Sequence, residues 1–267
     1  MAPPDISYER VRDIFQAMRS EKINGVPLSD LVGGGDPEVV AAEIVAALAK
    51  HVDLGAVRSI LDVGGGCGRI ATALTQHLSA MSHYVGVDIV PSLVEFGRKF
   101  VSARYPQFEF LLLEESNFTY DAWRPKGSVA DLTRVSDARP RDSVDLAMSV
   151  SLFTHLDYAS AVQILSAIGG MLTKGGQAFV TVFVLDSEVK ARIRAGQTVF
   201  QFPHRTPSGE LFAEKIEDPT YAVGYSIEKL EGLVRSADLQ REHWMRGYWS
   251  QSSPREIFQD ALVLRKT

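Results

Sequence analysis

Short runs of hydrophobic residues alternate with longer amphipathic stretches through the middle of the chain. Five of these runs have the length of strands: "SILDV" (59–63), "HYVGV" (83–87), "FEFLLL" (108–113), "VDLAMSV" (144–150) and "QAFVTVFVL" (177–185). The stretches between them predict helices over about 69–80, 91–104 and 157–172. Nearly continuous apolar strands, each followed by a helix, are typical of a parallel sheet covered on both faces.

The end of the chain follows a different pattern. A helix-like segment, "SIEKLEGLVRSA" (226–237), precedes two strand-like segments, "LQREHWM" (239–245) and "DALVLRK" (260–266). Since no helix separates the last two, we expect them to form an antiparallel ribbon at the edge of the sheet.

Three stretches lie outside this pattern, and each is long for a connection. Residues 1–55 are expected to be helical, while 114–143 and 186–225 link predicted elements. Long connections are uncommon unless they bind or cover something. We therefore predict an N-terminal helical lid segment over 1–55 and a main domain over 56–267, in which the insertion 186–225 is either a substrate lid or a solvated loop.

Composition and charge narrow the class of protein. The chain has 267 residues, of which 45% are hydrophobic and 23% charged, with a net charge of −5. This balance argues against nucleic acid, whose binding needs a basic face. No apolar run approaches the ~20 residues of a membrane span, and the first residues are too charged for a signal peptide. We expect a cytoplasmic protein without a membrane or nucleic-acid partner.

The stretch "LDVGGGCGR" (61–69) follows a predicted strand directly. A dinucleotide fingerprint, G-x-G-x-x-G, lacks its third glycine here because position 69 is Arg, and no G-x-x-x-x-G-K-[ST] loop is present. Gly64, Gly66 and Gly68 nevertheless allow positive φ and close approach of a ligand to the backbone. Cys67, the single cysteine, excludes an internal disulfide, and we interpret it as a small tolerated residue rather than a redox thiol.

A second strand supplies a matching acid. In "YVGVDIVPS", Asp88 stands at the carboxyl end of the strand, where its carboxylate could accept hydrogen bonds from ribose hydroxyls. Ligands of open α/β sheets bind at this edge, so Asp62 and Asp88 are expected to converge on one crevice. Either aspartate alone could be only a helix cap; together they predict a cofactor site.

An earlier glycine triplet receives a different interpretation. Gly33 to Gly35 precede Asp36, a good N-cap, and Pro37, a good first helical residue. We predict a turn that leads into a helix, with a hinge for an N-terminal lid as the alternative.

Three segments carry a resemblance to a known family. "ILDVGGGCGRIATALT", "YVGVDIVPSLVEFGRKF" and "GGMLTKGGQAFVTVF" resemble successive motifs of class I S-adenosylmethionine-dependent methyltransferases, over roughly residues 36–266. The chain is most similar to bacterial small-molecule enzymes with an S-x-F-T-H segment and a G-x-W…FQD ending, here "SLFTH" (151–155) and "GYWSQSSPREIFQD" (247–260).

The resemblance implies a fold and a cofactor. The fold is α/β, a Rossmann-like doubly wound seven-stranded sheet, mostly parallel with an antiparallel C-terminal strand, plus N-terminal helices. The cofactor is S-adenosyl-L-methionine. Gly64, Gly66 and Gly68 would pass under its methionine part, Asp62 would lie near its amino group, and Asp88 would bind its ribose.

The same resemblance extends the cofactor site by three residues. Ile89 would pack on the adenine, and Ser149, at the end of the fourth strand, would complete the set. Glu114 aligns best with an acid that the family often has near the adenine amine, although Glu115 follows it and leaves the register open.

Methyl transfer from a sulfonium is an in-line displacement, for which positioning can lower the barrier by ~7–11 kcal/mol. A base beside a hydroxyl acceptor adds about 10²–10⁴-fold. His155 follows the fourth strand at the same edge as the glycine loop, so we predict that it is the catalytic base. The alternative is a structural histidine that bonds a backbone carbonyl. No metal is expected, because clustered carboxylates cannot be assembled from the sequence.

Candidate acceptor-binding residues come from two segments. His204 and Arg205, in "FQFPHRTPSGELF" (200–212), could contact an anionic acceptor such as a sugar phosphate. Tyr248 and Trp249 could stack on a sugar or an aromatic acceptor, although aromatic residues near a strand are commonly core.

We therefore expect an enzyme that methylates a hydroxyl of a small molecule, a saccharide or a secondary metabolite. An N-methyltransferase acting on a small-molecule amine and a non-catalytic S-adenosylmethionine-binding protein stay open as alternatives. An NAD-dependent oxidoreductase is opposed by the glycine spacing and by Arg69. The N-terminal helices could cover the active site or a partner subunit, so a homodimer also stays open.

Overall fold

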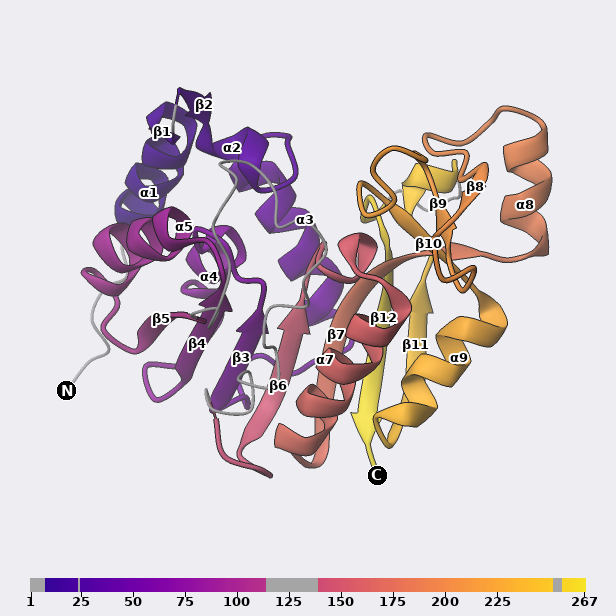
Figure 1. Ribbon diagram of the computed structural model, residues 1–267. Coiled ribbons are helices and arrows are strands. Elements are labelled where there is room, and N and C mark those ends of the chain that lie inside the picture. The colour runs from indigo at the N-terminus through magenta and orange to yellow at the C-terminus, as the bar shows by residue number, and fades with distance from the viewer. Residues whose placement is uncertain (1–7, 24, 114–138, 252–255) are drawn as a thin grey trace.

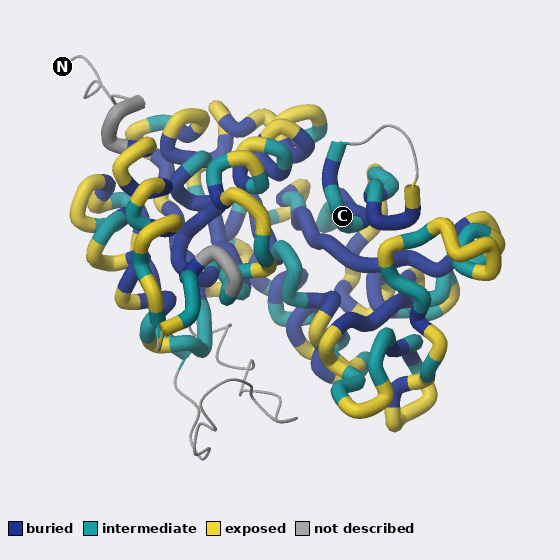
Figure 2. The backbone as a smooth tube through the Cα atoms, turned by 90° about the horizontal axis from the view of Figure 1, so that it is seen from above, coloured by how far each residue is buried: buried dark blue, intermediate teal, exposed yellow. Residues whose placement is uncertain are grey.

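The computed structural model describes residues 8–23, 25–113, 139–251 and 256–267. Within these ranges a ten-stranded sheet forms the centre of the molecule, with helices on both sides (Figure 1). Figure 2 shows buried segments running through the interior, with exposed residues concentrated at the periphery. None of the described helices has the length and apolar character that crossing a membrane requires.

Five parallel strands make up the first half of the sheet, in the order β5-β4-β3-β6-β7. Their bounds are β3 (Ser59–Val63), β4 (His83–Asp88), β5 (Phe108–Leu112), β6 (Val144–Ser149) and β7 (Leu172–Leu185). The chain starts in the middle at β3, moves outward to β5 and then returns to the other side of β3 at β6. This reversal creates a crevice at the carboxyl ends of β3 and β6, where ligands of open α/β sheets bind.

The C-terminal ribbon forms as predicted. β11 (Leu239–Met245) and β12 (Asp260–Lys266) are antiparallel, and β12 pairs antiparallel with β7. These seven strands are the ones that the sequence predicts. β7 is longer than predicted, since it begins at Leu172 rather than at residue 177.

The insertion 186–225 adds three short strands that the sequence pattern did not reveal. They are β8 (His204–Arg205), β9 (Phe212–Ala213) and β10 (Val223–Ser226). β10 pairs in parallel with Phe183 to Leu185, the last residues of β7, which extend beyond the register of β12. Two of these strands have only two residues, too few to give a recognisable alternation.

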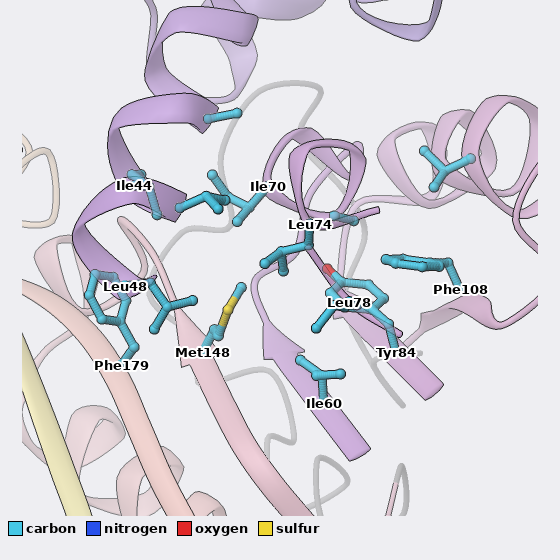
Figure 3. Packing of buried hydrophobic residues seen from close by; sticks show 14 of the residues in the cluster. Ile44, Leu48, Ile60, Ile70, Leu74, Leu78, Tyr84, Phe108, Met148 and Phe179 are labelled. Atoms are coloured by element: carbon cyan, nitrogen blue, oxygen red, sulfur yellow. The ribbon is translucent and has the colours of Figure 1, made fainter. Parts of the chain in front are cut away.

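Helices cover both faces of the sheet. Alternating strand residues place two of the three hydrophobic clusters of the described residues on opposite faces of the sheet. Ile60, Tyr84 and Met148 pack with α1 (Tyr8–Ser20), α3 (Pro37–Ala49) and α4 (Arg69–Leu74). Figure 3 shows this first cluster, in which Ile44 and Leu48 of α3 lie near Ile70 and Phe179. Leu61, Val85 and Ala147 pack on the opposite face with α7 (Tyr158–Met171) and α9 (Ile227–Ser236).

The remaining described elements are short. They are β1 (Lys22–Ile23), β2 (Val26–Pro27), α2 (Leu28–Leu31), α5 (Pro91–Phe96), the π-helix η1 (Gly97–Ser102), the 3-10 helices η3 (Phe153–His155) and η4 (Tyr248–Ser250), and α8 (Ser187–Arg194). α4 ends earlier than predicted, where the hydroxyls of Thr72 and Thr75 donate to the carbonyls of Gly68 and Thr72. Such bonds compete with helical ones.

The turn before α3 forms as predicted. Gly33, Gly34 and Gly35 have φ of 97°, 69° and 75°. Asp36 caps α3 by accepting from the backbone N–H groups of residues 38 and 39 at 3.0 and 3.1 Å, and Pro37 is the first helical residue. Arg19 of α1 binds the same carboxylate, so the cap also joins α1 to α3.

Close packing of α7 against the end of α9 predicts a specific destabilisation. A Cβ on Gly169 would lie 2.2 Å from the carbonyl oxygen of Ala237, whereas one on Gly170 would meet only the Arg141 side chain, at 3.6 Å. Gly169→Ala should therefore lower the free energy of unfolding by about 1–3 kcal/mol, since the helices must separate. Gly170→Ala is the matched control, and it should be neutral or stabilising. Urea unfolding of both variants tests this; equal effects would contradict it.

Candidate active site

A cavity of about 930 Å³ lies at the carboxyl edge of the sheet. Its wall comes from four parts of the chain: the turn at 33–35 with α3, the glycine loop with the ends of β3 and β4, the segment after β6, and the insertion with the C-terminal segment. The topological reversal between β3 and β6 places these parts around one space.

The glycine loop is held in an unusual conformation. Gly64, Gly66 and Gly68 have φ of 80°, 56° and 83°. Gly64 lines the cavity, while a Cβ on Gly68 would lie 2.6 Å from the Phe110 ring. The loop thus requires glycine for its backbone angles and, at Gly68, for packing.

Asp88 connects this loop to β4. Its Oδ2 accepts from the N–H of Gly66 and its Oδ1 from the N–H of Val90, both at 2.9 Å. Burial raises the pKa of the carboxyl, and the backbone hydrogen bonds act in the opposite direction. Asp88 and Ile89 both line the cavity, and a carboxylate has lone pairs beyond the two used here.

Asp62 and Ser149 lie behind the loop rather than in the cavity wall. Asp62 is buried and accepts a hydrogen bond of 2.6 Å from the hydroxyl of Tyr84. Burial raises its pKa to about 7, although the Tyr84 bond favours the ionised form. Ser149 is buried, and its hydroxyl donates to the carbonyl of Val63 at 2.9 Å, which joins β6 to β3. Glu114, the predicted adenine contact, lies outside the described residues.

His155 lines the cavity from η3. Its Nδ1 lies 3.0 Å from the carbonyl oxygen of Thr220, in the insertion. A carbonyl can only accept, so Nδ1 carries the proton in this contact, and in the neutral ring the lone pair is then on Nε2.

Hydrogen bonds among three polar residues join the "SLFTH" segment after β6 to the "FQD" segment at the start of β12. Ser151 adopts φ of 62°, which is uncommon for a residue with a side chain. Its N–H donates to the hydroxyl of Thr181 at 2.8 Å and its own hydroxyl to the Gln259 side-chain oxygen at 3.2 Å. Thr181 also donates to that oxygen. All three residues line the cavity, and sequence reasoning singled out none of them, although "SLFTH" and "FQD" contain two.

The four predicted acceptor contacts separate in the structure. Tyr248 lines the cavity, and its hydroxyl lies 3.4 Å from a carboxylate oxygen of Glu43 in α3. Trp249 is fully buried, and its indole N–H donates to Asp260 at 2.8 Å. His204 and Arg205 form β8, outside the cavity wall, where Arg205 stacks 3.7 Å from the centre of the Phe212 ring.

The insertion still contributes to the site through other residues. Phe200, Asp218, Thr220, Tyr221 and Ala222 line the cavity. The sequence did not predict that these residues line the cavity, because an irregular loop has no periodicity that separates buried from exposed positions.

Neither a reactive thiolate nor a metal centre is formed by the residues that the structure describes. Burial raises the pKa of the Cys67 thiol to about 12, so it is protonated near neutrality and not a reactive thiolate. Among the residues that the structure describes, no group of three or more His, Cys, Asp or Glu side chains is arranged to hold a metal ion.

Residues 60–176 match a family model described as a methyltransferase domain. A protein-L-isoaspartate O-methyltransferase of Methanothrix thermoacetophila is 31% identical over 80 residues, which are 30% of this chain and 38% of that protein. The chain therefore matches well under half of the length of this relative.

Solved structures share the fold at low identity. A mitomycin 7-O-methyltransferase, MmcR, is 14% identical with a TM-score of 0.58, over 95% of this chain and 60% of that one. A magnesium protoporphyrin IX methyltransferase from Synechocystis PCC 6803, solved with bound S-adenosylhomocysteine, is 14% identical with a TM-score of 0.54, over 97% and 94% of the two chains.

The Asp62 carboxyl makes stability depend on pH. Its pKa is about 7 in the folded protein against 3.8 ordinarily, so the folded state holds this proton more tightly than the unfolded state. Its contribution to the free energy of unfolding therefore falls as pH rises from about 4 to about 7, by about 1.4 kcal/mol for each pH unit. Asp62→Asn has no carboxyl to titrate, so between about pH 4 and 7 its free energy of unfolding should rise relative to that of the wild type as the pH increases.

Urea unfolding at a series of pH values measures the difference. Tyr84→Phe is the control, because it keeps the carboxyl and removes a bond to its ionised form; its pH dependence should be as steep as that of the wild type or steeper. Parallel curves for the wild type and Asp62→Asn would contradict the assignment.

Proposed function

We propose that this chain, whose residues 60–176 form a class I S-adenosylmethionine-dependent methyltransferase domain, methylates a hydroxyl group of a small molecule. The observation that carries the proposal is the position of His155. It lines the same cavity as Gly64 and Asp88, and its Nδ1 faces the carbonyl of Thr220 at 3.0 Å.

The residues of the cavity fit S-adenosylmethionine. The backbone at Gly64 can approach the methionine part, Asp88 offers a carboxylate to the ribose hydroxyls, and Ile89 offers an apolar surface to the adenine. A volume of about 930 Å³ is at the upper end of small-molecule sites, roughly 300–1,000 Å³. When bound, the cofactor supplies a methyl group activated by a positively charged sulfur. Asp62 would act indirectly, by joining β3 to β4 through Tyr84.

His155 would accept the proton of the acceptor hydroxyl. With Nδ1–H donated to Thr220, the lone pair on Nε2 is the basic site of the ring. A positioned base contributes about 10²–10⁴-fold to such a step. Because Thr220 belongs to the insertion, acceptor binding and base orientation would depend on the same segment.

The acceptor side of the cavity supports a small, partly apolar molecule. Phe183, Phe200, Phe258, Tyr221 and Tyr248 line it, and aromatic rings suit the faces of sugars and planar rings. We propose a saccharide or an aromatic secondary metabolite, with 1–55 and 186–225 as covering segments, since both contribute residues to the wall. Among the solved structures similar in fold is one named mitomycin 7-O-methyltransferase.

The His155 role predicts a loss of turnover without a loss of cofactor affinity. His155→Ala should lower kcat by at least ~100-fold, because proton removal from the acceptor becomes unassisted, while calorimetry should give an unchanged Kd for S-adenosylhomocysteine. His83→Ala, at the opposite end of β4, is the matched control.

Mass spectrometry of products from mixed saccharides, phenols and amines supplies the acceptor. Methylation of amines alone would contradict O-methylation, and near-normal kcat in His155→Ala would contradict the base.

The Asp88 role predicts a loss of cofactor affinity. Asp88→Ala should weaken S-adenosylhomocysteine by about 10–100-fold, because ribose hydroxyls lose a charged acceptor. Asp88→Asn keeps an oxygen for the Gly66 N–H and should lose less. Calorimetric titration of both variants checks this; an unchanged Kd in Asp88→Ala would exclude the assigned contact.

A further inference from the structure

Arg69 is a buried cation without an acidic partner. The residue is only 7% exposed, and the hydrogen bond that the structure gives it is a long one, 3.4 Å from Nη1 to the carbonyl oxygen of Gly34. Among the described residues, no carboxylate lies within 4.0 Å of its guanidinium, whereas Arg19 and Arg246 both pair with acids. A buried charge in this state is costly unless something compensates it.

The position of Arg69 suggests what that compensation is. It follows Gly68 directly and lines the cavity, between the glycine loop and the turn at 33–35. Its Nη2 is 3.9 Å from where a Cβ on Gly33 would lie, an ordinary van der Waals distance, so the guanidinium lies against that turn.

Arg69 also differs in charge from the rest of the wall. Glu43, Asp88, Asp157 and Asp218 line the cavity, and in the described part of the chain Arg69 is the one Arg or Lys that does. Burial lowers the pKa of its guanidinium, yet an arginine stays protonated near neutrality. In the described part of the chain, the cavity wall therefore combines one arginine with four acidic residues and many apolar ones.

We infer that Arg69 binds the carboxylate of the methionine part of the cofactor. The inference rests on the proposed cofactor site: with the ribose at Asp88, the methionine part would reach the cavity wall to which Gly64 and Arg69 both contribute. A guanidinium presents two parallel N–H donors to a carboxylate, the geometry of strong charge-assisted pairs. Because Nη1 also faces Gly34, the bound carboxylate would be joined through Arg69 to the turn that precedes α3.

Two ligands that differ by one group test this directly. S-adenosylhomocysteine carries the carboxylate, and decarboxylated S-adenosylhomocysteine keeps the adenosine, the sulfur and the ammonium group without it. The wild type should bind the first at least 10-fold more tightly in calorimetric titration. Arg69→Gln should weaken S-adenosylhomocysteine by about 10–100-fold and the decarboxylated ligand by less than about threefold. Arg69→Lys, which keeps the charge but not the paired donors, should fall between.

The outcomes separate the alternatives. If Arg69→Gln lost affinity equally for both ligands, Arg69 would be a structural residue. If it lost affinity for neither, Arg69 would not contact the cofactor. Either result overturns the inference. The wild-type comparison needs no variant, so equal affinity for the two ligands overturns it even if Arg69→Gln does not fold. Arg58→Gln, an exposed arginine before β3 at the opposite edge, should change neither Kd.

If the proposed function failed but this inference held, the measurements would show a different pattern. The ligand preference would then depend on Arg69 while the enzyme methylated no hydroxyl. A wild type that bound neither ligand would overturn both proposals.

Discussion

The site depends on the attachment of the glycine loop to the end of β4. The N–H groups of Gly64 and Gly65 donate to the carbonyl of Val87, and that of Gly66 donates to Asp88. These bonds satisfy backbone groups that a turn between a buried strand and a helix would otherwise leave unpaired. They also fix where the chain enters α4, and hence the position of Arg69. Asp88, the residue expected to bind the ribose, thus also holds the loop in place through the Gly66 N–H.

A second buried carboxylate organises the other half of the cavity. Asp260 accepts from the N–H groups of Val184 and Gly247 and from the indole of Trp249. It thereby joins the end of β7 to the segment before β12. The adjacent Gln259 faces the opposite way and holds the hydroxyls of Ser151 and Thr181. Successive residues of an extended chain point to opposite sides, so Gln259 reaches the cavity wall while Asp260 is buried.

The sequence predicted most strongly where periodicity and local chemistry agree. The strands of the main sheet and the Asp36 cap follow from apolar runs and from N-cap preference. The prediction for Asp62 was less informative, although alternation already puts it on the same face as Ile60, toward Tyr84. Trp249 was predicted to contact the acceptor, but it is buried with its indole N–H on Asp260, a pairing that no local sequence pattern indicates. Arg69 drew attention only as a departure from a fingerprint; its burial without an acid is a property of the folded chain.

The length of β7 has a mechanical consequence. The strand pairs with β6 and β12 in the main sheet and then with β10 at Phe183 to Leu185. The insertion is therefore hydrogen-bonded to a central strand of the sheet. Tyr225 of β10 adds a bond of 2.8 Å to the carbonyl of Phe153. Swinging the insertion away would break a hydrogen-bonded ladder, whereas the glycine turn before α3 is a joint between helices. The part of the cavity wall that the insertion contributes is therefore anchored by strand pairing, and moving it would cost backbone hydrogen bonds of the main sheet.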